Sequence, residues 1–365
     1  MTLIIFIIIL GVLVLVHELG HFLAAKKAGV RVDEFGFGYP PRALVLGEKW
    51  GTKFSLNWIP FGGFVKIFGE NYDEPRKPLE NSFGFRFTEV SKKWQAVILA
   101  GGVTFNILFA WVLFSIGLVV GLPTSVDNNF GGEVKNPALT IIDIRPDSPA
   151  ENAGLKAGDK IKNVSDVNGQ KIENSTPESV SDFVDKSSDR ISLEVERGDK
   201  ILNFEIVPQS GLVEGKKIIG INMDMVGTLS LPIHKAFIEG GKVTWNILDM
   251  TVFGIFNLIK DALKGEGDLS SITGPVGIVG LVGDASRLGF TYLLTFTALI
   301  SINLAVVNLI PIPALDGGRL LFVAIESITR RPINPKFAQT TNTIGFALLI
   351  TLMLIVTYRD ILKLF

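Results

Sequence analysis

The sequence lacks cysteine altogether, holds only three histidines and is poor in charge, with 19% charged residues among 365. The absence of cysteine excludes disulfides from any exported part. It also argues against a structural zinc site, which usually has four protein ligands that are often cysteines. The formal net charge of −1 gives no basis for nucleic-acid binding. With 47% hydrophobic residues and a mean hydropathy of +0.40, the composition indicates an integral membrane protein with a substantial soluble part.

Four apolar stretches are each long enough to cross a hydrocarbon core about 30 Å thick. They cover residues 2–25, 96–122, 290–312 and 343–361. The first stretch lacks a preceding basic segment and a small-residue cleavage site, so we interpret it as a retained span. Lys26, Lys27 and Arg31 follow it directly. The positive-inside rule therefore predicts an extracytoplasmic N-terminus and a cytoplasmic loop after the first span.

The expected fold is a multi-pass α-helical membrane protein with four transmembrane helices and an inserted β-rich domain. The expected segments are helix 1 (1–25), a cytoplasmic loop (26–95), helix 2 (96–122), an extracytoplasmic domain (123–210), a linker (211–289), helix 3 (290–316), a cytoplasmic connection (317–342) and helix 4 (343–365). Within the linker, polar side chains between residues 233 and 264 recur at helical spacing. This pattern predicts an amphipathic helix that lies in the outer interface and does not cross the membrane.

A His-Glu-Leu-Gly-His sequence at residues 17–21 lies inside the first apolar stretch. At this spacing His17 and His21 project from one face of a helix, where both imidazoles can reach a single Zn²⁺. Glu18 is close enough to act as the base toward a zinc-bound water. A charged side chain costs about 2.5–3.5 kcal/mol at the centre of a membrane helix, so ionisable residues there indicate function. The weaker alternatives are a chance match and a purely structural zinc site.

A catalytic zinc bound by two histidines needs a third protein ligand, and Asp316 is the candidate. It lies in Asn308-Leu-Ile-Pro311-Ile-Pro313-Ala-Leu-Asp316-Gly-Gly, at the end of the third apolar stretch. The local sequence alone is equally consistent with Asp316 as the N-cap of a following helix. Topology favours the ligand, because the predicted orientation brings Asp316 and the histidine pair to a similar depth near the cytoplasmic face. Pro311 and Pro313 would interrupt the helix and free backbone groups that must line a cavity or be buried.

Two further segments suggest β-structure. Residues 53–69 are rich in aromatic and β-branched side chains around Pro60 and Gly62-Gly63, which predicts a membrane-associated β-hairpin. An ordinary cytoplasmic loop is the alternative. Residues 141–169 resemble a PDZ domain, and one copy accounts for the inserted domain. Such domains bind a peptide or C-terminal tail along a sheet edge. We place that edge at Leu139, Thr140, Ile141 and Ile142.

These motifs together resemble the site-2 protease family of intramembrane zinc metalloproteases, of the bacterial regulator of sigma-E protease type. The resemblance covers nearly the whole chain. It implies one Zn²⁺ per chain on His17, His21 and Asp316, with Glu18 as the base. It also implies substrate contacts at Asn308, Pro311, Pro313, Gly62, Gly63 and Phe64. The family more often has Gly-Pro where this second span has Ala100-Gly101-Gly102, four residues before Asn106. We interpret Asn106 as a bond between helices without catalytic meaning.

The expected function is hydrolysis of peptide bonds in or near the transmembrane helices of single-pass membrane proteins. Anti-sigma factors and remnant signal peptides fit as substrates, and a bacterial inner membrane fits as the location. The partners are then the bilayer, the substrate, and a peptide at the PDZ domain. The alternatives are a PDZ-bearing scaffold with an inactive zinc site and a metal transporter. Glu18 argues against the first, because a metal holder needs no base, and the peptide-binding domain argues against the second.

Overall fold

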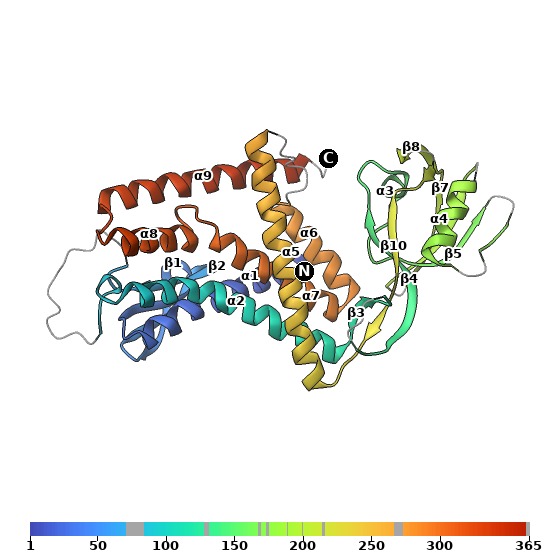
Figure 1. Ribbon diagram of the computed structural model, residues 1–365. Helices are drawn as coiled ribbons and strands as arrows, with labels where there is room; N and C mark the ends of the chain where they lie inside the picture. The colour runs from blue at the N-terminus through green and yellow to red at the C-terminus, as the bar shows by residue number, and fades with distance from the viewer. Residues whose placement is uncertain are drawn as a thin grey trace. The chain divides into compact units, whose positions relative to one another are not determined.

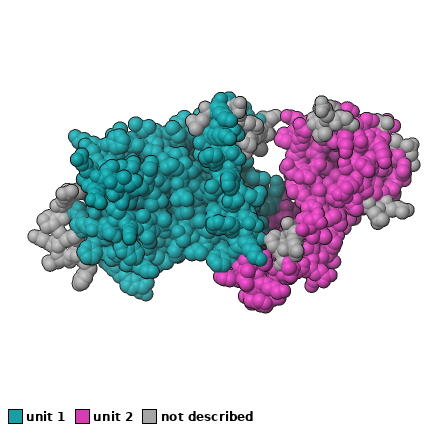
Figure 2. All heavy atoms as spheres, in the orientation of Figure 1, with its two compact units in different colours: residues 1–115, 240–286, 293–365 teal, residues 116–239, 287–292 magenta. Residues whose placement is uncertain are grey.

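The structure is a computed structural model that describes residues 1–70, 84–127, 131–166, 169–172, 175–187, 189–198, 200–213, 216–265 and 273–362. Parts of the predicted cytoplasmic loop, inserted domain and linker, and the end of predicted helix 4, lie outside these ranges. The chain forms two compact units. Unit 1 comprises residues 1–115, 240–286 and 293–365, and unit 2 comprises residues 116–239 and 287–292 (Figure 2).

Four described helices are long and apolar enough to cross a membrane. They are α1 (Thr2–Lys27), α2 (Lys92–Val120), α7 (Phe290–Leu309) and α9 (Pro335–Leu362). The prediction of four apolar helices is thereby confirmed. Their bounds differ most in two places: α7 ends at Leu309, before the predicted residue 316, and α9 begins at Pro335, earlier than the predicted residue 343. The first turns of α9 carry polar residues that concealed its start from a hydropathy reading.

Helices α1 and α2 cross at glycines on both sides. A Cβ atom at Gly20 would lie 2.2 Å from the carbonyl oxygen of Gly101, and one at Gly101 would lie 2.6 Å from the carbonyl oxygen of Gly20. Neither position can hold a side chain unless the helices separate, because both contacts are to backbone atoms. Small residues allow such close helix packing in membranes. The crossing holds α2 against the part of α1 that carries the histidine motif.

The predicted segment 53–69 does form β-structure, but not a hairpin of its own: the hairpin is β1 (Val32–Lys49) paired with β2 (Thr52–Ile67). Its association with the membrane stays a prediction. Strand β2 folds back on itself, so that its two halves flank the same part of β1. Residues 34–37 of β1 pair with residues 53–56 and also with residues 63–66. Residues 63–67 are thereby left as an outer strand of this small sheet. The sheet packs on α1 through Phe22, whose ring centroid is 5.5 Å from that of Phe35. A short 3-10 turn, Phe87–Glu89, precedes α2.

After α7 the chain breaks and turns back into α8 (Asp316–Thr329). The two prolines predicted to interrupt the helix lie in this break. The reversal is tight: a Cβ at Gly317 would lie 2.2 Å from the carbonyl oxygen of Leu309, and one at Gly318 would lie 2.3 Å from that of Ile312. Glu326 of α8 pairs with Lys92 at the start of α2. The double glycine is therefore required for the bend that carries Asp316 back into unit 1.

Two more helices lie mostly in unit 1, α5 (Ile233–Lys264) from residue 240 onward and α6 (Pro275–Leu288) up to residue 286. Figure 1 shows α5 running across the direction of α1, α2 and α9. The α6 N-terminus is capped by Asp360 of α9, which accepts hydrogen bonds from the amides of Gly274, at 3.2 Å, and Gly277, at 2.8 Å. The placement of α5 in the outer interface stays a prediction, which its crosswise direction supports.

Unit 2 is built on a six-stranded sheet in the order β3-β10-β4-β5-β6-β7. The strands are β3 (Leu122–Ser125), β4 (Val134–Ile144), β5 (Lys160–Asp166), β6 (Ile191–Arg197), β7 (Lys200–Ile206) and β10 (Ile221–Leu229). Helices α3 (Pro149–Asn152) and α4 (Pro177–Lys186) and a small pair, β8 (Gln209–Val213) and β9 (Lys216–Ile218), accompany them. The β-rich insertion is confirmed, but β10 extends it beyond the predicted end at residue 210.

The predicted peptide edge at Leu139, Thr140, Ile141 and Ile142 is wrong. These residues belong to β4, which has β10 on one side and β5 on the other. Both backbone groups of Ile141 are bonded within the domain, its amide to Asp159 and its carbonyl to Gly158. The side chains of Leu139 and Ile141 lie in the domain core. A strand with partners on both sides cannot accept another, and β10, which fills one side, lies far along the chain and was assigned to the linker.

Replacing Gly101 with alanine should destabilise unit 1, because its Cβ would press on the α1 backbone. Overpacking of this kind typically costs about 1–3 kcal/mol. The matched control is Gly254→Ala in α5, where a Cβ meets nothing within 4 Å and a gain of about 0.5–1 kcal/mol is expected from helix propensity. Equilibrium unfolding in detergent would compare the two variants. Equal midpoints would contradict the close crossing.

Candidate functional site

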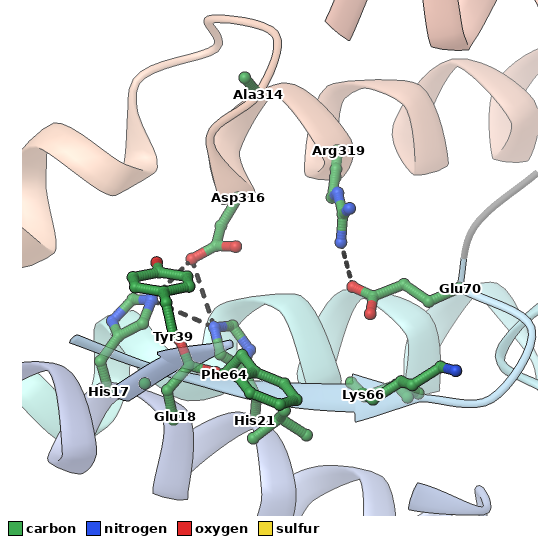
Figure 3. Close-up of a pocket in the computed structure, with 13 residues that line it drawn as sticks. His17, Glu18, His21, Tyr39, Phe64, Lys66, Glu70, Ala314, Asp316 and Arg319 are labelled. Atoms are coloured by element: carbon green, nitrogen blue, oxygen red, sulfur yellow. Dashed lines mark hydrogen bonds and ion pairs between the residues drawn. The ribbon is translucent and has the colours of Figure 1, made fainter. Parts of the chain in front are cut away.

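Three ionisable side chains from distant parts of the chain meet in unit 1. His17 and His21 lie on one face of α1, as their spacing predicts, with their Nε2 atoms 3.1 Å apart. Asp316, the first residue of α8, points toward them (Figure 3). Its Oδ2 lies 3.0 Å from Nε2 of His17 and 3.4 Å from Nε2 of His21. One ligand atom from each residue lies within 4.8 Å of the other two, which is the arrangement of a metal site.

The chemistry of these donors fits a zinc ion. Nδ1 of His21 lies 2.8 Å from the carbonyl oxygen of Ile98, which can only accept, so Nδ1 carries the proton. Nε2 of neutral His21 is then a bare acceptor that faces the carboxylate oxygen of Asp316. Two acceptors at this distance repel unless a cation lies between them. Two histidines and one carboxylate match the ligand set of catalytic zinc sites that keep a fourth position open.

The residues around the three side chains leave space for an ion, and Asp316 supplies a negative charge. A Cβ at Gly102 of α2 would lie 2.5 Å from Nε2 of His21 and 2.7 Å from Nε2 of His17, so only glycine leaves this side open. Burial raises the pKa of Asp316, but the adjacent imidazoles of His17 and His21 outweigh this and hold the pKa well below its usual range. The candidate third ligand is therefore an ionised carboxylate.

The alternative role of Asp316 as a helix cap is wrong. The N-cap of α8 is Leu315, which makes no side-chain cap bond, and Asp316 is the first residue within the helix. Its carboxylate bonds the histidines instead of the helix amides. The structure brings Asp316 to the histidine pair, and its role as a metal ligand stays a prediction.

Glu18 lies beside the three ligands on the wall of the same cavity. The backbone amide of Val65 in β2 donates a hydrogen bond to its carboxylate. A Cβ at Gly63 would lie 3.6 Å from Cγ of Glu18, so β2 passes directly over this side chain. The hairpin thus holds the carboxylate in place next to the metal ligands, where a general base would have to be.

The cavity has a volume of about 500 Å³, and several of its lining residues were not foreseen. Tyr39 of β1 stands over the ligands, and the side chains of Glu70 and Arg319 form an ion pair on the opposite side (Figure 3). Burial raises the pKa of Tyr39, and the charge of Glu18 raises it further. No sequence motif marks these residues. They meet because the hairpin and α8 both fold over α1.

The predicted substrate-binding residues divide into two groups. Gly63 and Phe64 line the cavity. Gly62, Asn308, Pro311 and Pro313 are not among the described residues that line it. Gly62 instead makes room for a lining residue, since a Cβ there would lie 2.8 Å from the ring of Tyr39.

Asn106 has a more specific contact than the predicted bond between helices. It is fully buried, and its Nδ2 lies 3.2 Å from Nδ1 of His17. Its backbone carbonyl accepts a hydrogen bond of 2.8 Å from the hydroxyl of Ser301 in α7. The position of Asn106 in the middle of an apolar helix marked it in the sequence. The sequence did not reveal that its side chain contacts His17, a candidate metal ligand.

Comparison with known proteins decides the family. The model of peptidase family M50 matches residues 5–352. The chain belongs to this family. Among its relatives, the zinc metalloprotease RasP of Geobacillus kaustophilus is 31% identical over 435 residues, covering 99% of this chain and 97% of the relative. The regulator of sigma-W protease RasP of Bacillus subtilis is 30% identical, covering 100% and 99%. The regulator of sigma E protease of Salmonella typhi is 28% identical, covering 98% of each.

This M50 peptidase is a zinc metalloprotease and an integral membrane protein of the site-2 protease family. His17 and His21 lie within a candidate membrane span. The alignment with the Salmonella typhi relative extends over 451 residues, whereas this chain has 365, so the relative contains additional segments.

Replacing Asp316 with alanine should remove zinc, because it deletes one of three protein ligands. The control is Asp360→Ala, which deletes a buried carboxylate that caps α6 outside the site. We expect the control to lose about 0.5–2 kcal/mol of stability and to keep its metal. Elemental analysis of both purified variants would measure zinc per chain. Full zinc content in Asp316→Ala would show that Asp316 is no ligand.

Proposed function

We propose that this M50 peptidase hydrolyses peptide bonds in or near the transmembrane helices of single-pass membrane proteins, as a step of regulated intramembrane proteolysis. The observation that carries the proposal is a general base, Glu18, held beside three zinc ligands within an apolar helix and under a strand of the hairpin. The names of the RasP and sigma E relatives favour substrates that control sigma factors, such as anti-sigma factors, and remnant signal peptides remain within the same substrate class.

The proposed orientation has the N-terminus and unit 2 outside a bacterial plasma membrane and the zinc site near its cytoplasmic face. The basic residues that follow α1 support it, together with Lys92 and Lys93 at the start of α2. Arg330 and Arg331, between α8 and α9, fall on the same side under this topology. Water and the polar loops then reach the site from the cytoplasm.

In the proposed mechanism, His17, His21 and Asp316 would hold a zinc ion, which would supply Lewis acidity toward the scissile carbonyl and toward water near neutral pH. Glu18 accepts the proton of the attacking water and later delivers it to the amine of the leaving peptide. The Val65 amide keeps the Glu18 carboxylate turned toward the cavity. The ion pair of Glu70 with Arg319 keeps a second carboxylate neutralised on the cavity wall.

A substrate helix must unwind before it can be cut, because its carbonyls are occupied by helical hydrogen bonds. The outer strand at residues 63–67 offers an extended segment a place to pair. It has β1 on one side, and its residues line the cavity. An unwound substrate that adds to this edge would run past Glu18 in an extended conformation. Phe64 and Tyr39 then contact its side chains.

We propose that unit 2 is a PDZ domain whose peptide edge is on β10. Along Ile221–Asp224, β10 pairs with β4 on one side, whereas on the other side β3 reaches only Val226–Leu229 and the amide of Val126 bonds the carbonyl of Met225. Helix α4 packs near this part of β10 and contributes Val180 and Val184 to the same core as Met223. An extended peptide or C-terminal tail fits between the strand and the helix.

Replacing Glu18 with glutamine should lower turnover by about 10²–10⁴-fold, the usual contribution of a general acid–base group, and leave zinc bound. Cleavage of a single-pass substrate in detergent and zinc analysis of the same sample would measure both effects. The control Glu178→Gln changes an exposed residue at the start of α4 and should behave as wild type. Zinc removal by a chelator should abolish the wild-type activity, and added zinc should restore it. Normal turnover in Glu18→Gln would refute its role as the base.

Unit 2 should control access and take no part in chemistry. Ser125 and Val226 are direct partners in the β3–β10 pair, so a two-residue Asn-Gly turn can join them and replace residues 126–225. We expect this excised protein to keep its zinc and to cut substrates with short outer segments at the wild-type rate.

Substrates with large outer domains should be cut faster by the excised protein than by wild type. The same excision combined with Glu18→Gln is the control for contaminating proteases. An excised protein that folds and binds zinc but cuts no substrate would show that unit 2 is needed for catalysis.

A further inference from the structure

The amide of Asn106 is the one buried side-chain group among the described residues that has an atom without a hydrogen-bond partner. Its Oδ1 is unpaired, while its Nδ2 faces Nδ1 of His17 at 3.2 Å. The side chain is fully buried, so water does not satisfy the oxygen from the surface. An unpaired buried acceptor typically costs about 1–3 kcal/mol. Such a group at a metal ligand indicates a role that depends on the state of the metal site.

The orientation of the amide fixes where the proton of His17 lies. With Nδ2 toward the ring, Asn106 donates and Nδ1 accepts, so the proton is on Nε2. There it points to Oδ2 of Asp316, 3.0 Å away. This tautomer is incompatible with zinc on Nε2, because a ligand nitrogen must be unprotonated.

The metal-bound state needs the opposite tautomer. Nε2 then gives its lone pair to zinc, and Nδ1 carries a proton that requires an acceptor. A half-turn of the Asn106 amide brings Oδ1 to that position. Asparagine carries a donor and an acceptor on one planar group, so it can serve both tautomers without moving its backbone. The backbone is fixed to α7 by Ser301, which donates to the Asn106 carbonyl.

The two histidines therefore differ in how they are held. Nδ1 of His21 faces a backbone carbonyl, that of Ile98, which fixes the zinc-binding tautomer permanently. Nδ1 of His17 faces a side chain that can turn. We propose that Asn106 is a positioning residue for zinc: its amide rotates to accept the Nδ1 proton of His17 when the metal binds, and this bond sets the orientation and basicity of that ligand.

The decisive variants change the amide while keeping a side chain of similar length and branching. Asn106→Leu offers neither donor nor acceptor, and Asn106→Asp offers only acceptors. If the bond to His17 positions the ligand, the leucine variant should bind zinc about 10–100-fold more weakly, the usual effect of losing such a partner. The aspartate variant should bind zinc at least as tightly as wild type. Competition with a chromogenic chelator would measure affinity, and the visible spectrum of the cobalt-substituted protein would report the geometry of the ligands.

Ser301→Ala is the matched control for packing, because it removes a hydrogen bond of Asn106 between the same helices but leaves the amide intact. We expect wild-type zinc affinity and cobalt spectrum in this variant. If Asn106→Leu does not fold, Asn106→Ala carries the same expectation with less bulk. Wild-type zinc affinity in the leucine or alanine variant would overturn the proposal and leave Asn106 as a bond between helices. An equal loss of affinity in the aspartate variant would show that the acceptor is not what matters.

Discussion

The contact between Asp316 and the two histidines of α1 is the constraint on which the rest of unit 1 depends. It joins residues separated by 299 positions in the sequence. For the carboxylate to arrive there, α7 must end early, the chain must reverse within a few residues, and α8 must begin at Asp316 itself. The backbone contacts of Gly317 and Gly318 follow from this reversal. The metal site therefore requires this shape of the α7–α8 turn.

The close helix crossing serves the same site from the other side. Gly20 and Gly101 bring α2 so near to α1 that the next residue, Gly102, faces both imidazoles. Ile98 and Asn106 of α2 then contact the outer nitrogens of the two rings. The ligand nitrogens are oriented by α2, and the ligands themselves come from α1 and α8.

Local patterns predicted the parts of the fold that depend on local physics. The apolar runs gave the spans, and the spacing of His17, Glu18 and His21 gave a shared helix face. Asp316 could be assigned once topology was added, because depth in the membrane restricts which residues can meet. Pairings between distant segments could not be predicted. β10 enters the sheet beside β4 from beyond the expected domain end, and this reversed the choice of peptide edge. Glu70 and Arg319 pair across 249 positions without any motif to mark them.

The pairing of β3 with β10 has a consequence for how this architecture can change. The strand that enters unit 2 and the strand that leaves it are hydrogen-bonded neighbours, with Leu122 opposite Leu229 and Ser125 opposite Val226. Everything inserted between Ser125 and Val226 begins and ends at nearly the same point. Such an insertion can lengthen, shrink or duplicate during evolution without altering the spacing of the helices on either side. Unit 1 can therefore stay unchanged while the domain that is inserted into it diversifies.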